Sequence, residues 1–152
     1  MYEDQFTYNC NTFEDDLLES RKELFLRRQF ADVTLVSDDM VPFPAHRTVL
    51  SSSSKLLKSL FEVTNEPRQV LFLKGVSQIH LQSILKFIYL GETSVRADQV
   101  KDFSAAVNEL GIDKLKIDSD LDQKAKKKKD TKKLVERLNF LSPFEGTSNF
   151  KD

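Results

Sequence analysis

The chain has 152 residues, 39% of them hydrophobic and 31% charged, a composition typical of a soluble globular domain with a polar extension. It has no apolar run long enough to span a membrane, its acidic N-terminus is unlike a signal peptide, and its single cysteine, Cys10, excludes an internal disulfide. Residues 1–113 hold 12 Lys and Arg against 17 Asp and Glu, whereas residues 114–152 hold 11 against 7. The acidic part is therefore a poor candidate for direct DNA contact, because phosphate binding needs clustered cations.

The first pattern in the chain is the alternation of Phe6, Tyr8 and Cys10 within the segment 5–10. A period of two residues is typical of a strand, so a short N-terminal strand is expected here. The segment is very short, and a disordered terminus explains it almost as well.

A helix is predicted next, because polar capping residues precede Phe13 and acidic residues occupy the first turn. Phe13, Leu17 and Leu24 fall near one face of this helix, with Leu18 and Phe25 beside them. This is more apolar surface than one core-facing stripe requires. Two interpretations remain: a wide core stripe, or one face against the core and a second against a partner.

The stretch 29–61 predicts a hairpin followed by short helices. Val33 and Leu35 alternate with Thr34 and Val36, as in a half-buried strand. The second run, 41–45, contains two prolines, which cannot donate to a sheet ladder, so this strand is expected at an edge. An amphipathic helix follows, with apolar residues at Leu56, Leu57, Leu60 and Phe61.

The segment 70–73 is continuously apolar and predicts a fully buried strand. Two more helices should follow, the first capped by Ser77 and closed by Gly91, the second closed by Gly111. From about Leu121 the composition changes, and the lysines gather between residues 123 and 133, where mutual repulsion favours a solvated segment.

The residues that carry catalysis or bind metals and cofactors are sparse. The two histidines, His46 and His80, are far apart in sequence, and one cysteine cannot build a structural zinc site. Glycine is too scarce for a phosphate-binding loop, and the serines at 51–54 lack the surroundings of a nucleophile. We therefore predict no catalytic, metal or cofactor-binding residue and no enzyme, and we expect His46 to be packed and hydrogen-bonded.

Several spaced motifs, in this order, resemble the BTB/POZ domain. They are Phe30-Ala31-Asp32-Val33-Thr34-Leu35, Ala45-His46-Arg47-Thr48-Val49-Leu50-Ser51, Leu85-Lys86-Phe87-Ile88-Tyr89 with Gly91-Glu92, and Glu109-Leu110-Gly111-Ile112. The resemblance covers about residues 5–115 and is closest to the arthropod Tramtrack and Bric-à-brac group of transcription regulators. It implies a mainly α-helical α+β fold, with a short three-stranded sheet flanked by about five to six helices.

The resemblance, together with the lysine-rich composition of the C-terminal part, predicts a division of the chain into three parts. Residues 1–12 form an N-terminal segment that includes the strand exchanged between subunits, residues 13–116 form the BTB/POZ domain, and residues 117–152 form a lysine-rich, largely disordered tail. The implied dimer interface consists of Phe6, Tyr8, Phe13, Leu17, Leu18 and Leu24.

Asp32 and Arg47 match the acidic and basic residues of a charged pocket near the dimer interface of zinc-finger BTB proteins, where they are linked to dimer integrity and corepressor recruitment. A purely structural ion pair or cap is an equally weighted alternative. This chain has one more residue between the two positions than some relatives have, so their pairing is a point to be tested.

The function implied is a homodimerising, and also heterodimerising, protein-interaction domain of a nuclear transcription or chromatin regulator, without zinc fingers of its own. It would recruit corepressors or other proteins, bind no cofactor or membrane, and read no DNA sequence directly. The alternative is a substrate adaptor for a cullin-3 ubiquitin ligase, although the expected hydrophobic-x-Glu spacing is absent near Phe61. The lysine run, Lys126, Lys127, Lys128, Lys129, Lys132 and Lys133, resembles a nuclear-localisation signal, with a solubilising linker in a cytoplasmic protein as the alternative.

Overall fold

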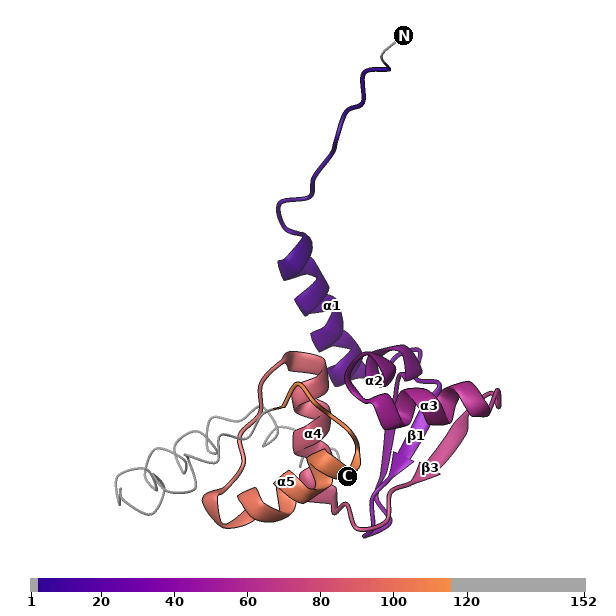
Figure 1. The fold of residues 1–152 in the computed structure, drawn as a ribbon, viewed down its shortest axis with the longest axis vertical. Helices are drawn as coiled ribbons and strands as arrows, with labels where there is room; N and C mark the ends of the chain where they lie inside the picture. Colours follow the sequence, from indigo (N-terminus) through magenta and orange to yellow (C-terminus); the bar gives the residue numbers. More distant parts are fainter. Residues whose placement is uncertain (1–2, 116–152) are drawn as a thin grey trace.

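The computed structural model describes residues 3–115, and the lysine run and the proposed tail lie outside them. Within that range five α-helices surround a sheet of three short strands (Figure 1), which confirms the expected mainly helical α+β fold. The elements in chain order are α1 (Phe13–Arg27), β1 (Val33–Val36), β2 (Pro42–Ala45), α2 (Arg47–Ser53), α3 (Lys55–Val63), β3 (Gln69–Phe72), α4 (Gln78–Leu90), the 3₁₀ helix η1 (Ala97–Gln99) and α5 (Val100–Glu109).

The sheet has the order β2-β1-β3, with β1 antiparallel to β2 and parallel to β3. Val33 and Leu35 of β1 are buried, as their alternation predicts. β2 lies at an edge of the sheet, as its two prolines predict. An edge strand has no neighbour on its outer side, so the N–H groups that proline lacks are not needed there for a hydrogen bond to another strand.

The expectation of a fully buried third strand is wrong. Val70 and Phe72 of β3 are 64% and 53% exposed, whereas Leu71 packs against the core. β3 is an edge strand with only one covered face, so alternate side chains point out of the protein. A continuous apolar run does not distinguish this arrangement from burial on both faces.

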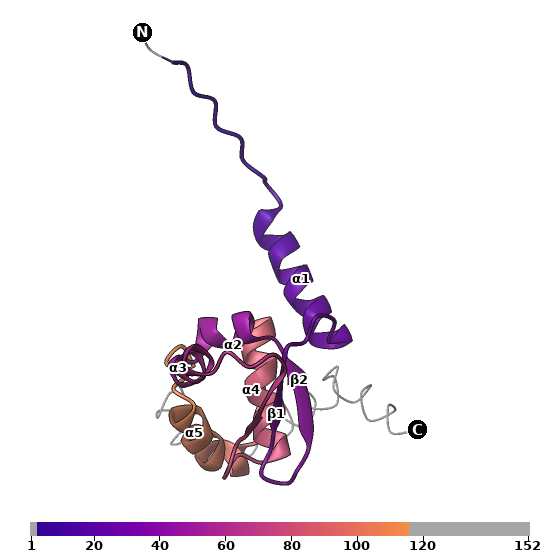
Figure 2. The same cartoon turned by 90° about the vertical axis from the view of Figure 1, so that its right-hand side faces the viewer.

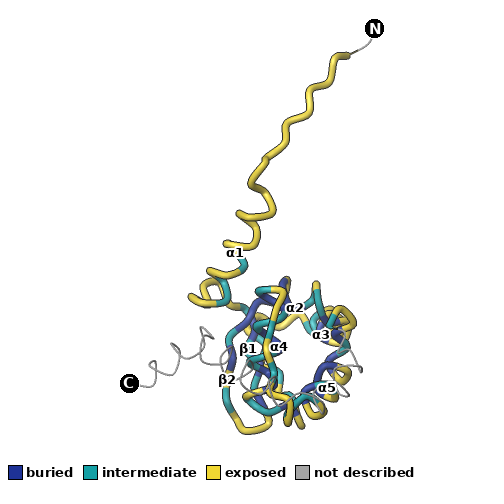
Figure 3. The backbone as a smooth tube through the Cα atoms, turned by 90° about the vertical axis from the view of Figure 1, so that its left-hand side faces the viewer, coloured by how far each residue is buried: buried dark blue, intermediate teal, exposed yellow. Residues whose placement is uncertain are grey.

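The core lies between the inner face of the sheet and the helices α2, α4 and α5 (Figures 2 and 3). α4 contributes most to it, because Leu81, Ile84 and Leu85 recur at helical spacing and are buried. Its predicted ends are confirmed: the Ser77 side chain caps the first turn, and Gly91 has the left-handed conformation (φ 79°) that closes the helix.

α1 has a different environment from α4. It projects from the body of the domain, and none of its residues is buried (Figures 1 and 3). Only Leu24 and Phe25, near its C-terminal end, pack against the core. Residues 3–10 precede it as an extended segment that pairs with no strand among the described residues, so the predicted N-terminal strand is not formed within one chain.

Candidate interaction surface and charged pair

The N-terminal half of α1 presents an exposed apolar stripe. Phe13, Leu17 and Leu18 are 62%, 52% and 52% exposed. Phe13 and Leu17, four residues apart, lie on the same face of the helix, and Leu18 widens this apolar surface to roughly 140° of the circumference. Of the two interpretations of α1, a wide core stripe therefore does not describe the single chain. Apolar side chains gathered on one projecting element are typical of a protein-interaction surface.

The remaining residues of the implied interface fall into two groups. Phe6 and Tyr8 are largely exposed on the extended N-terminal segment, next to the stripe in the chain. Leu24 lies at the other end of α1, half-buried against the domain's own core. Sequence reasoning missed two exposed apolar residues nearby, Leu26 and Phe30. The exposure of Phe30 could have been predicted from the sequence, because Phe30 lies in the short connection between a predicted helix and a predicted strand.

Asp32 and Arg47 are in contact, as their candidate pairing predicts. The backbone N–H of Arg47 donates to Asp32 Oδ1 (2.8 Å), and Arg47 Nε donates to Asp32 Oδ2 (3.4 Å). Asp32 stands just before β1 rather than inside it, and Arg47 is the first residue of α2. The carboxylate therefore serves both as a cap for the first turn of α2 and as an ion-pair partner, at a half-exposed position that another protein can reach.

His46, beside this pair, is buried and hydrogen-bonded, as expected. Its Nδ1 lies 2.7 Å from Tyr89 Oη, its backbone N–H donates to the same oxygen (3.0 Å), and its Nε2 contacts the carbonyl of Gln29. The three contacts are satisfied together if the Tyr89 hydroxyl donates to Nδ1 and Nε2–H donates to the carbonyl. Burial raises the pKa of Tyr89 to about 12, so the hydroxyl keeps its proton at neutral pH.

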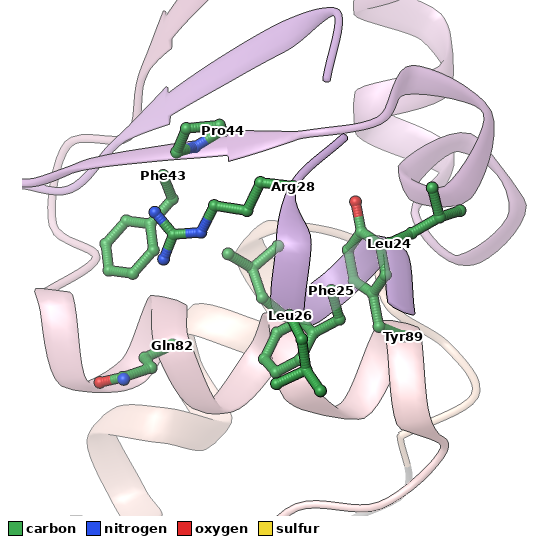
Figure 4. A pocket seen from close by; sticks show the side chains of 9 residues that line it. Leu24, Phe25, Leu26, Arg28, Phe43, Pro44, Gln82 and Tyr89 are labelled. Carbon is green, nitrogen blue, oxygen red and sulfur yellow. The ribbon is translucent and has the colours of Figure 1, made fainter. Parts of the chain in front are cut away.

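A small hollow lies between the C-terminal turn of α1, β2 and α4 (Figure 4). Its polar lining groups are Arg28, Gln82 and the hydroxyl of Tyr89. Arg28 and Gln82 are neither nucleophiles nor ordinary proton-transfer groups, and the Tyr89 hydroxyl is already hydrogen-bonded to His46. The hollow thus fits an apolar side chain better than a reacting substrate. Its full lining is Leu24, Phe25, Leu26, Arg28, Phe43, Pro44, Gln82, Leu85 and Tyr89.

Among residues 3–115, no group of three or more His, Cys, Asp or Glu side chains is arranged to hold a metal ion. In the same part of the chain, no helix combines the length and the apolar character needed to cross a bilayer.

The fold and this surface define a protein-interaction module, and comparison with known families agrees. The family model of the BTB/POZ domain matches residues 21–126. The chain belongs to the BTB family, whose domain mediates self-association and protein partnering and is not an enzyme fold.

Among curated proteins, the chain is similar to Drosophila melanogaster proteins. It is 35% identical to Longitudinals lacking protein-like over 108 residues, which cover 71% of this chain and 84% of that protein. It is 30% identical to the alpha isoform of Protein tramtrack over 112 residues, or 74% of this chain but only 14% of that protein. It is 30% identical to Protein bric-a-brac 2 over 108 residues, or 71% of this chain and 10% of that protein. The expected likeness to the Tramtrack and Bric-à-brac group is confirmed.

Two solved structures share the fold. The BTB domain of zebrafish PATZ1 has a TM-score of 0.61 at 24% identity and covers 71% of this chain and 88% of its own. The BTB domain of human Gigaxonin has a TM-score of 0.59 at 20% identity and covers 90% of this chain and 99% of its own.

Proposed function

We propose that this chain is a homodimerising, and also heterodimerising, BTB domain that serves a nuclear transcription or chromatin regulator by recruiting partner proteins. The observation that carries the proposal is the uncovered apolar stripe of α1, formed by Phe13, Leu17 and Leu18. A helix whose own domain buries none of its residues gains most by packing against a second subunit, because association then removes its apolar surface from water.

The N-terminal segment extends this contact. Phe6 and Tyr8 alternate on an extended and unpaired backbone, the arrangement needed for a strand that pairs with a sheet of the other subunit. In this division residues 1–12 are the exchanged segment, 13–116 are the interaction domain and 117–152 are the tail. The segment and the stripe adjoin, so one partner subunit can cover both.

The Asp32–Arg47 pair is the proposed site of partner recruitment. It is held in place by a backbone hydrogen bond as well as by the ion pair, so its two charges have a fixed orientation. A fixed pair at a half-exposed position favours a partner with complementary charges over one without them. Corepressor-type proteins are the proposed partners.

The nuclear role is proposed from the resemblance to the Tramtrack and Bric-à-brac group and from the lysine run 126–133 as an import signal. The chain spans only 14% of Protein tramtrack and 10% of Protein bric-a-brac 2. The acidic domain is not proposed to read DNA. It would instead bring a partner, or a longer BTB relative by heterodimerisation, to a regulatory complex.

The test is a double substitution of the stripe, Leu17→Asp with Leu18→Asp, in the full chain. Sedimentation equilibrium should show that the dimer is lost, because a buried unpaired charge costs roughly 3–5 kcal/mol by analogy with broken buried ion pairs. Ile79→Asp in α4 is the matched control, since Ile79 is 55% exposed and lies outside the stripe. A dimer that survives the double substitution would remove α1 from the interface, and strong capture of cullin-3 by the wild-type chain would favour the adaptor function instead.

A further inference from the structure

α3 carries an exposed apolar face of its own. Leu56, Leu60 and Val63 follow one another at spacings of four and three residues, so they lie on one side of the helix and form what we call the α3 stripe. All three are exposed, Val63 to 83%, whereas Leu57 of the same helix is buried in the core. α3 thus has one face for the core and a second apolar face that residues 3–115 leave exposed.

The described part of the chain ends beside the first turn of α3. The backbone N–H of Lys55 donates to the carbonyl of Gly111 (3.4 Å), and Lys55 Nζ pairs with Asp113 Oδ2 (2.6 Å). The described residues end two positions after Asp113. The C-terminal part of the chain therefore leaves the domain next to the α3 stripe.

That C-terminal part contains a segment whose pattern matches the α3 stripe. Leu134, Leu138 and Leu141 have the same spacings of four and three residues, and Pro143 sets a limit beyond which a helix does not continue. As a helix, residues 134–141 would present the three leucines on one face. Two apolar stripes of equal length and spacing can pack along each other as neighbouring helices do.

We propose that residues 134–141 dock as a helix on the α3 stripe of their own chain. α3 has nine residues and is therefore about 14 Å long. A flexible linker with the length of residues 116–133 has a root-mean-square span of about 23 Å, so it reaches either end of α3. Such a tether holds the segment at an effective concentration on the order of millimolar, at which even a weak contact covers the stripe.

Charge favours the antiparallel direction of docking. With Leu138 opposite Leu60, an antiparallel helix brings the cation of Arg137 to the flank of α3 that carries Glu62. A parallel helix would place the uncharged Asn139 on that flank instead. Opposite charges on neighbouring helices select one direction over the other, so the antiparallel arrangement is the one proposed.

Docking withholds the α3 stripe from other proteins, because an outside partner has to displace the segment before it reaches α3. Figure 2 shows α3 at the left edge of the domain, away from β2 and from the projecting half of α1. The contact therefore leaves the proposed α1 interface free. It forms within one chain and does not require the α1 dimer.

Amide hydrogen exchange of the full chain tests the docking. Leu138→Asp places a charge in the contact and should make the α3 amides exchange about tenfold faster or more, while those of α4 stay unchanged. Asn139→Asp is the matched control, since it adds the same charge off the leucine face and should leave α3 as in the wild type. Equal exchange of α3 in the wild type and in Leu138→Asp would overturn the proposal.

The same comparison separates docking from the proposed dimer. When Leu17 and Leu18 are replaced by aspartate, Leu138→Asp should still accelerate exchange in α3 by a similar factor. An acceleration that disappears in this background would show that α3 is covered only within an assembly, and would also overturn the proposal.

Disulfide trapping tests the direction. In a Cys10→Ser background, which removes the only cysteine, Val63→Cys with Leu134→Cys should cross-link on mild oxidation within one chain. Leu56→Cys with Leu134→Cys should cross-link at least about tenfold more slowly, because seven residues of helix separate these positions by about 10 Å, beyond disulfide range. Equal rates, the reverse order, or a cross-link between two chains would each overturn the proposal.

Discussion

α1 and α4 are helices of similar length, 15 and 13 residues, with opposite environments. α4 buries six residues, among them Ile84, Leu85 and Tyr89, whereas α1 buries none (Figure 3). The apolar residues of α4 are therefore accounted for by the fold of one chain. Those of α1, above all Phe13, Leu17 and Leu18, are not, and they form the exposed apolar surface that the proposed dimer would cover.

The largest effect should come from Ile84→Ala in α4. Ile84 is fully buried, so the change leaves a cavity and should lower the free energy of unfolding by about 3 kcal/mol, within a range of 2–5. Denaturant unfolding of the full chain should show this loss at every protein concentration.

Leu17→Ala is the matched change in α1. Leu17 is not buried by its own chain, so Leu17→Ala should lower the free energy of unfolding only by weakening association. This loss should therefore become smaller as the protein is diluted. A loss of about 3 kcal/mol that does not depend on concentration would contradict the contrast between the two helices.

Tyr89→Phe should have the next largest effect, because it removes the hydroxyl that serves the backbone N–H and Nδ1 of His46. Leaving these buried groups unpaired should cost about 1–3 kcal/mol at neutral pH, measured by denaturant unfolding. An unchanged midpoint would show that His46 is held by other contacts.

The same variant tests the alkaline behaviour of the fold. Burial raises the pKa of Tyr89 from 10.0 to about 12, so the unfolded chain loses this proton first. The contribution of Tyr89 is fully present below pH 10 and is lost as the pH rises through about 12, by up to about 2 kcal/mol. Comparison with Tyr89→Phe isolates it, since the variant should lack this part of the decline.

Asp32→Ala should have the smallest effect. It removes the acceptor for the first N–H of α2 and the ion pair with Arg47, which together contribute about 1 kcal/mol at a half-exposed position. Asp32→Asn keeps an acceptor and should cost less. Thermal unfolding compares the two, and equal losses would mean that the ion pair rather than the cap stabilises this junction.

Local patterns predicted the elements whose limits are set by neighbouring residues. The ends of α4 followed from Ser77 and Gly91, and the position of β2 at an edge followed from its prolines. β3 was mispredicted as fully buried because an apolar run reports hydrophobicity, not the number of covered faces. That number depends on which helices pack against each face of the sheet, and the spacing of residues within the strand does not indicate this.

The candidate site was also predictable only in part, because some of its contacts join residues that lie far apart in the chain. The contact of Asp32 with Arg47 came from matching family positions and proved geometrically sound. The partner of His46, Tyr89, lies 43 residues away in the chain, so no local pattern indicated it. The exposure of the α1 stripe was one of two open interpretations, and only the packing of the whole domain distinguishes them.

The most direct test of the central claim is the mass of the full wild-type chain in solution. If the exposed stripe of α1 is a subunit interface, light scattering at low micromolar concentration should give a dimer or a larger species. A clean monomer under these conditions would contradict it.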